Sequence, residues 1–184
     1  MTISISRPVT ALLAVITAGV LVVGGYAAHA ALADHNPTHV TFSGTTVAGV
    51  KIATSKTGAS VTGPTWTTVP GSGVSVLVPA GKSRLLTATF GGETQCSGPS
   101  LSWCSARIVV RKSGATTPAE LNPKSGAGYA MDAGNSTDNW EGHSMDRSGV
   151  IGAGSWQVYV QLAGTDGTTF YVEDWHFRVQ IFNR

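Results

Sequence analysis

The chain has 184 residues, 42% of them hydrophobic and 12% charged, and its twelve basic and ten acidic side chains leave a formal net charge of +2. This length indicates a single domain with at most a short tail. The balanced charge excludes a nucleic-acid-binding protein that relies on phosphate contacts. The low charge, together with the aromatic content, excludes a disordered tail protein.

The N-terminal segment has the three-part layout of a secretory signal peptide. Arg7 is the only charge before Asp34, an apolar run covers residues 9–23, and Ala28-His29-Ala30 places small residues where a signal peptidase reads. We expect a signal peptide over residues 1–30, a flexible mature N-terminus over 31–39, and a secreted, extracellular protein.

The alternative for this segment is an uncleaved membrane anchor. Residues 8–33 carry no acid or base, and a membrane-spanning helix needs about 20 mostly apolar residues. The paired Gly24-Gly25 and the small residues at 28–30 favour cleavage instead. After cleavage we expect no membrane association.

Beyond residue 39 the sequence predicts strands, because short β-branched and aromatic runs alternate with Gly, Pro, Asn and Asp clusters. The predicted strands cover residues 40–42, 47–52, 66–69, 74–78, 85–90 and 104–110, with weaker candidates at 128–131 and 140–145. Pro79 cannot donate to a ladder, so we expect the strand over 74–78 to end there.

Two alternating runs close the chain, over residues 156–162 and 170–181, with Thr165-Asp166-Gly167 between them. An Asp-Gly turn between alternating runs predicts a hairpin. Many short strands at intervals of about 8–12 residues are typical of a sandwich. We therefore expect an all-β, antiparallel, jelly-roll-like β-sandwich over residues 40–184.

Cys96 and Cys104 are separated by seven residues that include Gly98 and Pro99. In an exported protein an isolated pair is most simply a disulfide, worth about 2–3 kcal/mol for so short a loop. A zinc site or a redox pair is the alternative, but no histidine is near and the spacing is not C-x-x-C.

A series of residues in the second half of the chain resembles small exported β-sandwich proteins of high-GC Gram-positive bacteria, over roughly residues 85–184. That family has no assigned activity, so the resemblance implies export and a β fold but no mechanism. The residues that carry it are Cys96-x7-Cys104 with Trp103, Arg107-Ile108-Val109-Val110, Ser144-Met145-Asp146-Arg147-Ser148, Gly154-x-Trp156-x-Val158-x-Val160-Gln161 and Asp174-Trp175-His176.

Catalytic signatures are weak. No Gly-x-Ser-x-Gly motif occurs, and both cysteines are expected in a disulfide. Glu141 paired with Glu173 or Asp174 forms a glycosidase-like acid pair only if the fold brings the two together. We name no catalytic residue and lean against an enzyme.

The segment over residues 132–139 is rich in oxygen ligands, with Asp132, Asn135 and Asp138 as weak calcium candidates. It lacks the spacing of an EF-hand loop, and Asn and Asp are ordinary turn formers, so a plain loop is the favoured interpretation. We expect no other cofactor.

Of five tryptophans, Trp156 and Trp175 lie on apolar faces and are expected in the core, and Trp103 is expected to pack over the disulfide. Trp66 and Trp140 have polar, turn-like neighbours, which makes them the ligand-binding candidates, with core packing as the alternative.

Two functions remain open. The favoured one is a secreted, non-catalytic protein with a structural, adhesive or surface-interaction role, which binds a cell-surface protein or associates with itself. The other is a secreted carbohydrate-binding module or a weak carbohydrate-active enzyme, whose partner is a glycan.

Overall fold

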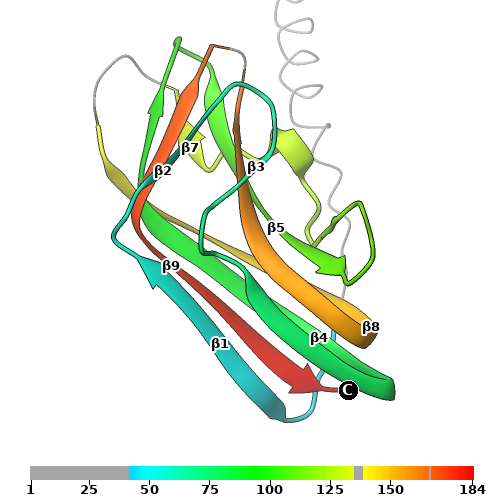
Figure 1. The fold of residues 1–184 in the computed structure, drawn as a ribbon. Coiled ribbons are helices and arrows are strands. Elements are labelled where there is room, and N and C mark those ends of the chain that lie inside the picture. The colour runs from blue at the N-terminus through cyan, green and yellow to red at the C-terminus, as the bar shows by residue number, and fades with distance from the viewer. Residues whose placement is uncertain (1–41, 135–138, 166) are drawn as a thin grey trace, which may run out of the picture. The chain divides into compact units, whose positions relative to one another are not determined.

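The computed structural model describes residues 42–134, 139–165 and 167–184, and its regular structure is almost entirely β (Figure 1). No helix within these ranges is long and apolar enough to cross a membrane. The predicted signal peptide lies outside the described residues. The elements are β1 (Val47–Ser55), β2 (Ala59–Thr62), β3 (Thr67–Thr68), β4 (Val74–Ser97), β5 (Trp103–Lys112), β6 (Ala119–Glu120), the 3-10 turn η1 (Gly126–Gly128), β7 (Asp132–Ala133), β8 (Glu141–Gly164) and β9 (Thr169–Asn183).

All strand pairs are antiparallel, and the main path through the sheet runs β1-β9-β4-β8-β5-β6. The short strands pair at the sides of this path, β2 with β9, β3 with β8 and β7 with β5. The expected all-β, antiparallel, jelly-roll-like sandwich with one disulfide is confirmed.

The two longest strands, β4 and β8, run side by side and turn a shared corner (Figure 1). Their register shifts between Val78 and Ser83 on β4, opposite Gly152–Gly154 on β8. Gly81 (φ +70°) and Gly154 (φ +129°) adopt backbone conformations there that side chains disfavour. The corner lets both strands contribute to both layers of the sandwich.

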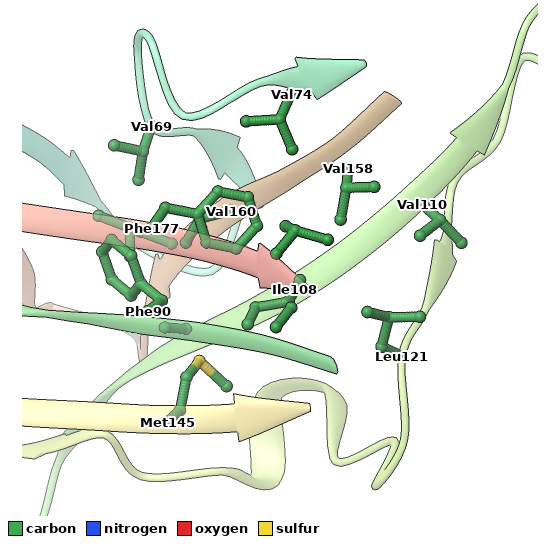
Figure 2. Close-up of a cluster of buried hydrophobic side chains, with 14 of the residues drawn as sticks. Val69, Val74, Phe90, Ile108, Val110, Leu121, Met145, Val158, Val160 and Phe177 are labelled. Atoms are coloured by element: carbon green, nitrogen blue, oxygen red, sulfur yellow. The ribbon is translucent and has the colours of Figure 1, made fainter. Parts of the chain in front are cut away.

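The core lies between the two layers as one cluster of buried side chains. Figure 2 shows Phe90, Met145 and Phe177 from one layer together with Ile108 and Val160 from the other. Each of the five is at most 3% exposed. Burial of such side chains contributes about 1.5–3 kcal/mol each to folding, which makes this cluster the main stabilising feature.

An irregularity in β9 keeps its apolar side chains on the inner face. Phe170 and Val172 are buried at even positions, whereas Trp175 and Phe177 are buried at odd positions. Asp174 (φ +44°) lies between these pairs, where the register with β4 also shifts. A bulge of this kind changes the phase of the alternation, so both runs point inward.

The disulfide joins Cys96, near the end of β4, to Cys104 in β5, with a Cα–Cα distance of 5.7 Å. Both cysteines are at most 1% exposed. The expected pair is therefore confirmed as a covalent link between two strands that are not neighbours in the sheet.

Several local expectations were wrong. Pro79 does not end its strand, because the corner accommodates it within β4. Tyr129 and Met131, in the predicted strand over 128–131, follow η1 and are in no strand. Phe42, the only described residue of the predicted strand over 40–42, is also in none. Finally, β8 and β9 do not form a hairpin, because β4 lies between them.

Candidate functional site

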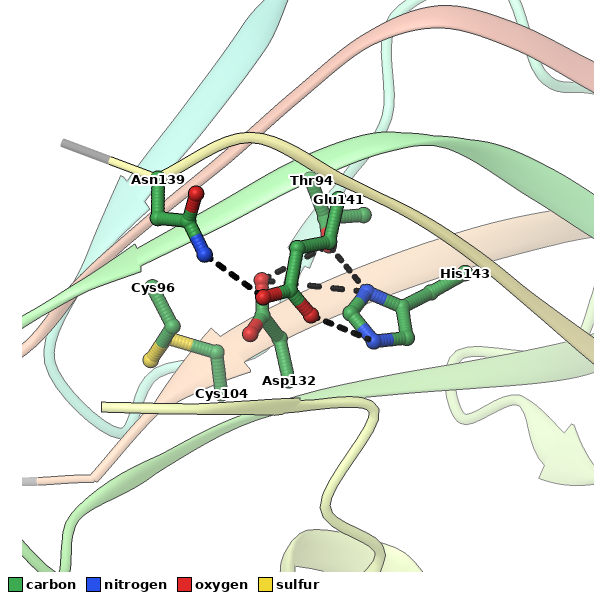
Figure 3. A network of polar contacts seen from close by, with 7 residues as sticks. All are labelled: Thr94, Cys96, Cys104, Asp132, Asn139, Glu141 and His143. Atoms are coloured by element: carbon green, nitrogen blue, oxygen red, sulfur yellow. Dashed lines mark hydrogen bonds and ion pairs between the residues drawn. A yellow bond between two sulfur atoms is a disulfide. The ribbon is translucent and has the colours of Figure 1, made fainter. Parts of the chain in front are cut away.

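A network of polar side chains occupies the end of the sandwich that carries the disulfide (Figure 3). At its centre Thr94 of β4 donates its hydroxyl hydrogen to Asp132 Oδ2 of β7 at 2.7 Å. The Thr94 hydroxyl oxygen (Oγ1) also lies 2.7 Å from His143 Nδ1 of β8. Since the single hydroxyl hydrogen is used on Asp132, Nδ1–H of His143 is the donor in the second bond.

Glu141 extends this network toward solvent. Its Oε2 lies 3.6 Å from His143 Nε2, and its Oε1 accepts a hydrogen bond from Asn139 Nδ2 at 2.6 Å (Figure 3). An ion pair forms at the first contact whenever the imidazole is protonated. Glu141 is therefore held from both sides, which fixes the start of β8.

The network supplies no exposed nucleophile, because Thr94 is fully buried and its hydroxyl already makes two hydrogen bonds. Of the two suggested acid pairs, Glu141 with Glu173 does not form either. Glu141 pairs in register with Thr94, whereas Glu173 pairs with Glu93, the preceding residue on β4. Because consecutive residues of a strand face opposite sides, Glu141 and Glu173 point to opposite faces of the sheet.

The same alternation explains how the network positions Trp140. Trp140 directly precedes Glu141, so anchoring Glu141 on the inner face directs Trp140 to the outer face. There its ring meets that of Tyr171 from β9, with ring centroids 6.5 Å apart and planes inclined by 59°. Trp140 is 41% exposed and Tyr171 is 36% exposed. We call these two side chains the aromatic pair.

The aromatic pair spans β4. Strands β8 and β9 both border β4, which separates their axes by about 9–10 Å, so the two rings lean toward each other across it. Gln95 of β4 pairs in register with Tyr171 and is only 6% exposed. Two residues away on each strand, Glu93 and Glu173 pair on the same outer face. The pair is therefore an exposed aromatic surface bordered by carboxylates.

Trp66, the other predicted binding residue, is half-buried and has one ring face covered. The guanidinium carbon of Arg107 lies 4.2 Å from the ring centroid. Arg107 Nε and Nη2 both donate to Gln161 Oε1, at 3.0 and 2.7 Å. Burial lowers the pKa of Arg107, and nearby Glu120 and Tyr159 act in the opposite direction. A guanidinium held this firmly leaves Trp66 less available than Trp140.

Of the three calcium candidates only Asp132 is described; Asn135 and Asp138 lie outside the described residues. Asp132 is buried and accepts the Thr94 hydrogen bond. Across residues 42–134, 139–165 and 167–184, no group of three or more His, Cys, Asp or Glu side chains is arranged to hold a metal ion.

Sequence reasoning found Trp140 but missed Tyr171 and the roles of Thr94 and His143. Tyr171 is 31 positions from Trp140 and separated from it in the sheet by β4. The one available signal in the sequence was the position of Tyr171 between Phe170 and Val172: both neighbours are buried, so Tyr171 faces outward. Thr94, Asp132 and His143 come from three different strands, and no local spacing connects them.

No known protein-family model matches the chain, and no curated protein matches it. Solved structures with a similar fold include Eiger TNF from S. frugiperda, at 10% identity and TM-score 0.39 over 73% of this chain and 93% of that one. A carbohydrate-binding module (CBM6cm-2) from Cellvibrio mixtus lichenase 5A, in complex with cellotriose, matches at 12% identity and TM-score 0.29 over 77% and 92%. The infectious bursal disease virus Gx strain structure matches at 12% identity and TM-score 0.34 over 80% and 40%. Likenesses this distant carry no argument about function.

Proposed function

We propose that this protein is a non-catalytic surface-interaction protein of the cell exterior that binds a glycan on the aromatic pair. The observation that carries the proposal is the contact between two aromatic rings that are both more than a third exposed, Trp140 and Tyr171, on an outer sheet face. Large aromatic side chains left in solvent cost hydrophobic free energy, so their joint exposure favours a binding role.

The chemistry around the aromatic pair suits a sugar. A sugar ring has apolar C–H faces that stack on aromatic rings and hydroxyl groups that need hydrogen-bond partners. Glu93 and Glu173, on the same outer face, offer carboxylate acceptors for such hydroxyls. A few polar groups placed around an apolar surface are the usual composition of a binding site for a small ligand.

The positioning of Trp140 supports a rigid site. Asn139 and Glu141, the residues on either side of it, are joined by a side-chain hydrogen bond of 2.6 Å. His143 and Thr94 then connect Glu141 to the buried Asp132. A side chain that is held in place before the ligand arrives loses less conformational entropy on binding.

The external location of the protein is part of this proposal. The Cys96–Cys104 disulfide supports it, because such bonds persist mainly in oxidising compartments. The signal peptide predicted over residues 1–30 agrees with it. N-terminal sequencing of the protein from the culture medium should begin at Ala31; an intact N-terminus on protein confined to the cell interior would contradict this part.

Glycan binding is tested with an array of neutral oligosaccharides, followed by calorimetry on the best ligand with Trp140→Ala and Tyr171→Ala. Each variant should weaken binding at least tenfold, since each removes one ring of the pair. Trp66→Ala is the matched control and should bind as the parent does. The proposal fails if the parent binds no glycan, or if the loss follows Trp66 instead.

Self-association is a second candidate role, favoured by the edge strand β1. Among the described residues β1 pairs along the sheet only with β9, which leaves its other edge without a strand. Three of its aliphatic side chains are strongly exposed, Val47 at 55%, Val50 at 46% and Ile52 at 64%. Such an edge can accept another strand.

The sequence of β1 permits pairing with its own copy. Antiparallel pairing about Ile52 sets Ile52 against its counterpart and Lys51 opposite Ala53, so that no like charges meet. Light scattering should then show a dimer that Ile52→Lys converts to a monomer. Leu77→Lys, at a residue 74% exposed on β4, is the control and should stay dimeric. A parent that is monomeric at all concentrations would remove this candidate.

A further inference from the structure

A concave surface separate from the aromatic pair lies at the end of β5, formed by residues of β4, β5 and β8 and by the turn that follows β5. It is an open groove of about 570 Å³. Ligand sites in proteins usually enclose about 300–1,000 Å³, so the groove has the size of a binding site. None of the residues that form the aromatic pair lines it.

Positive charge dominates the groove. Arg111 and Lys112 both line it, and no Asp or Glu is among its lining residues. Both side chains are exposed, and within the part of the chain that the structure describes neither forms an ion pair. Two cations in a concave surface without a counter-charge attract an anionic ligand.

The walls of the groove are fixed before any ligand binds. The turn after β5 is closed by a hydrogen bond from Ala115 N–H to Lys112 O at 3.0 Å, with Gly114 at φ +85°. Ser113 N–H donates to Ser155 O of β8 at 2.8 Å. On β8, Trp156 donates its indole N–H to Gly152 O at 2.9 Å. These bonds hold the turn against β8 and fix the tryptophan ring.

The cations are also placed by aromatic rings. Lys112 Nζ lies 5.9 Å from the Trp156 ring centroid, and the guanidinium carbon of Arg111 lies 5.8 Å from that of Tyr159. Contacts of this length restrain a long basic side chain without neutralising it. Both charges therefore remain available to a ligand.

We propose that this groove binds an acidic oligosaccharide, with Arg111 and Lys112 contacting its anionic groups. Four of the nine other lining residues carry hydroxyl or amide groups that can hydrogen-bond to sugar hydroxyls: Ser75, Ser113, Ser155 and Gln157. The choice of a sugar as ligand class rests on the proposed function; the choice of an anion rests on the groove alone.

The test is calorimetry on the full chain with oligogalacturonate, a sulfated oligosaccharide, an uncharged oligosaccharide and oligoglutamate. Both acidic sugars, or one of them, should bind with an affinity that falls as salt rises, and should bind more tightly than the uncharged sugar and oligoglutamate. Which of the two binds identifies the anionic group as carboxylate or sulfate. Failure of both acidic sugars to bind, or equal binding by the uncharged sugar once Trp140 is replaced by alanine, overturns the proposal. Tighter binding of oligoglutamate also overturns it, in favour of an acidic peptide.

Variants locate the site. Arg111→Ala and Lys112→Ala should each weaken binding of the acidic sugar about tenfold, since each removes a charge-assisted hydrogen bond. Lys51→Ala, an exposed lysine on β1, is the charge-matched control and should bind as the parent does. Circular dichroism checks that each variant is folded. Unchanged affinity in both groove variants, or an equal loss in the control, overturns the proposal.

The variant Trp140→Ala separates this proposal from the proposed function. It should abolish binding of a neutral glycan and leave binding of the acidic sugar intact. If Trp140→Ala abolishes acidic-sugar binding while the groove variants retain it, the ligand lies on the aromatic pair and the groove proposal is wrong. If no neutral glycan binds but the groove variants still lose acidic-sugar binding, the groove proposal stands and the aromatic-pair proposal falls.

Discussion

Replacing Thr94 by valine tests whether the polar network stabilises the end of the sandwich that carries Trp140. Valine keeps the shape of threonine but removes the hydroxyl group that donates to Asp132 and accepts from His143. The Asp132 side chain is only 7% exposed, so the carboxylate loses a partner that water cannot readily replace.

The expected size of this effect follows from those contacts. A hydrogen bond to a charged group contributes about 1.5–3 kcal/mol. Asp132 is buried and keeps only the longer contact with His143 Nδ1, 4.0 Å from its Oδ2, so its loss lies at the upper end of that range. The His143 side chain is 29% exposed, so water compensates part of its loss. We expect Thr94→Val to lower the free energy of unfolding by about 3 kcal/mol.

Urea unfolding measures this difference. Thr94→Ser is the matched control, because it keeps the hydroxyl group and loses only a methyl group, at a cost of about 1 kcal/mol. Thr94→Val should also cost much less in an Asp132→Asn background, where the ionised carboxylate is already absent. The reasoning is refuted if Thr94→Val costs less than Thr94→Ser, or if the cost is the same with and without Asp132.

Two further stability predictions follow from buried groups. Reducing the Cys96–Cys104 disulfide should lower the free energy of unfolding by about 2.5 kcal/mol, since it frees a short loop in the unfolded chain; equal urea midpoints with and without reductant would contradict this. Arg147 is 5% exposed, burial lowers its pKa, and its Nε and Nη2 have no hydrogen-bond partner among the described residues. Urea unfolding of Arg147→Met should therefore show an unchanged free energy of unfolding, or one raised by up to about 2 kcal/mol. A loss above about 1 kcal/mol would contradict this, because it would show that the guanidinium makes stabilising contacts in the folded protein.

The alternation of apolar residues was enough to predict β5 and most of β9. In β9 this alternation reflects one buried face, whereas both faces of β5 are largely buried. Alternation says nothing about which strands become neighbours. The turn at residues 165–167 looked like a hairpin turn, yet β9 pairs with β4 and not with β8. Pro79 was also predicted to end its strand, because proline is usually found at strand ends, whereas it lies within β4 at the corner.

The candidate site shows the same limit. Trp140 was identified from its polar neighbours, which reflect local exposure. Its partner Tyr171 was not, because the contact crosses β4 and depends on the pairing of three strands. Trp66 had equally polar neighbours, but Arg107, 41 positions later in the chain, covers one face of its ring. Long-range pairing therefore decided which tryptophan is available.

The most direct test of the account is whether a bound glycan contacts Trp140. In a two-dimensional ¹H–¹⁵N spectrum each tryptophan gives an indole N–H signal, and Trp140→Phe identifies the one from Trp140. Titration with the glycan that binds most tightly on the array should shift the Trp140 signal and leave that of Trp175, which is 3% exposed, unchanged. A glycan that binds without moving the Trp140 signal would contradict the central claim.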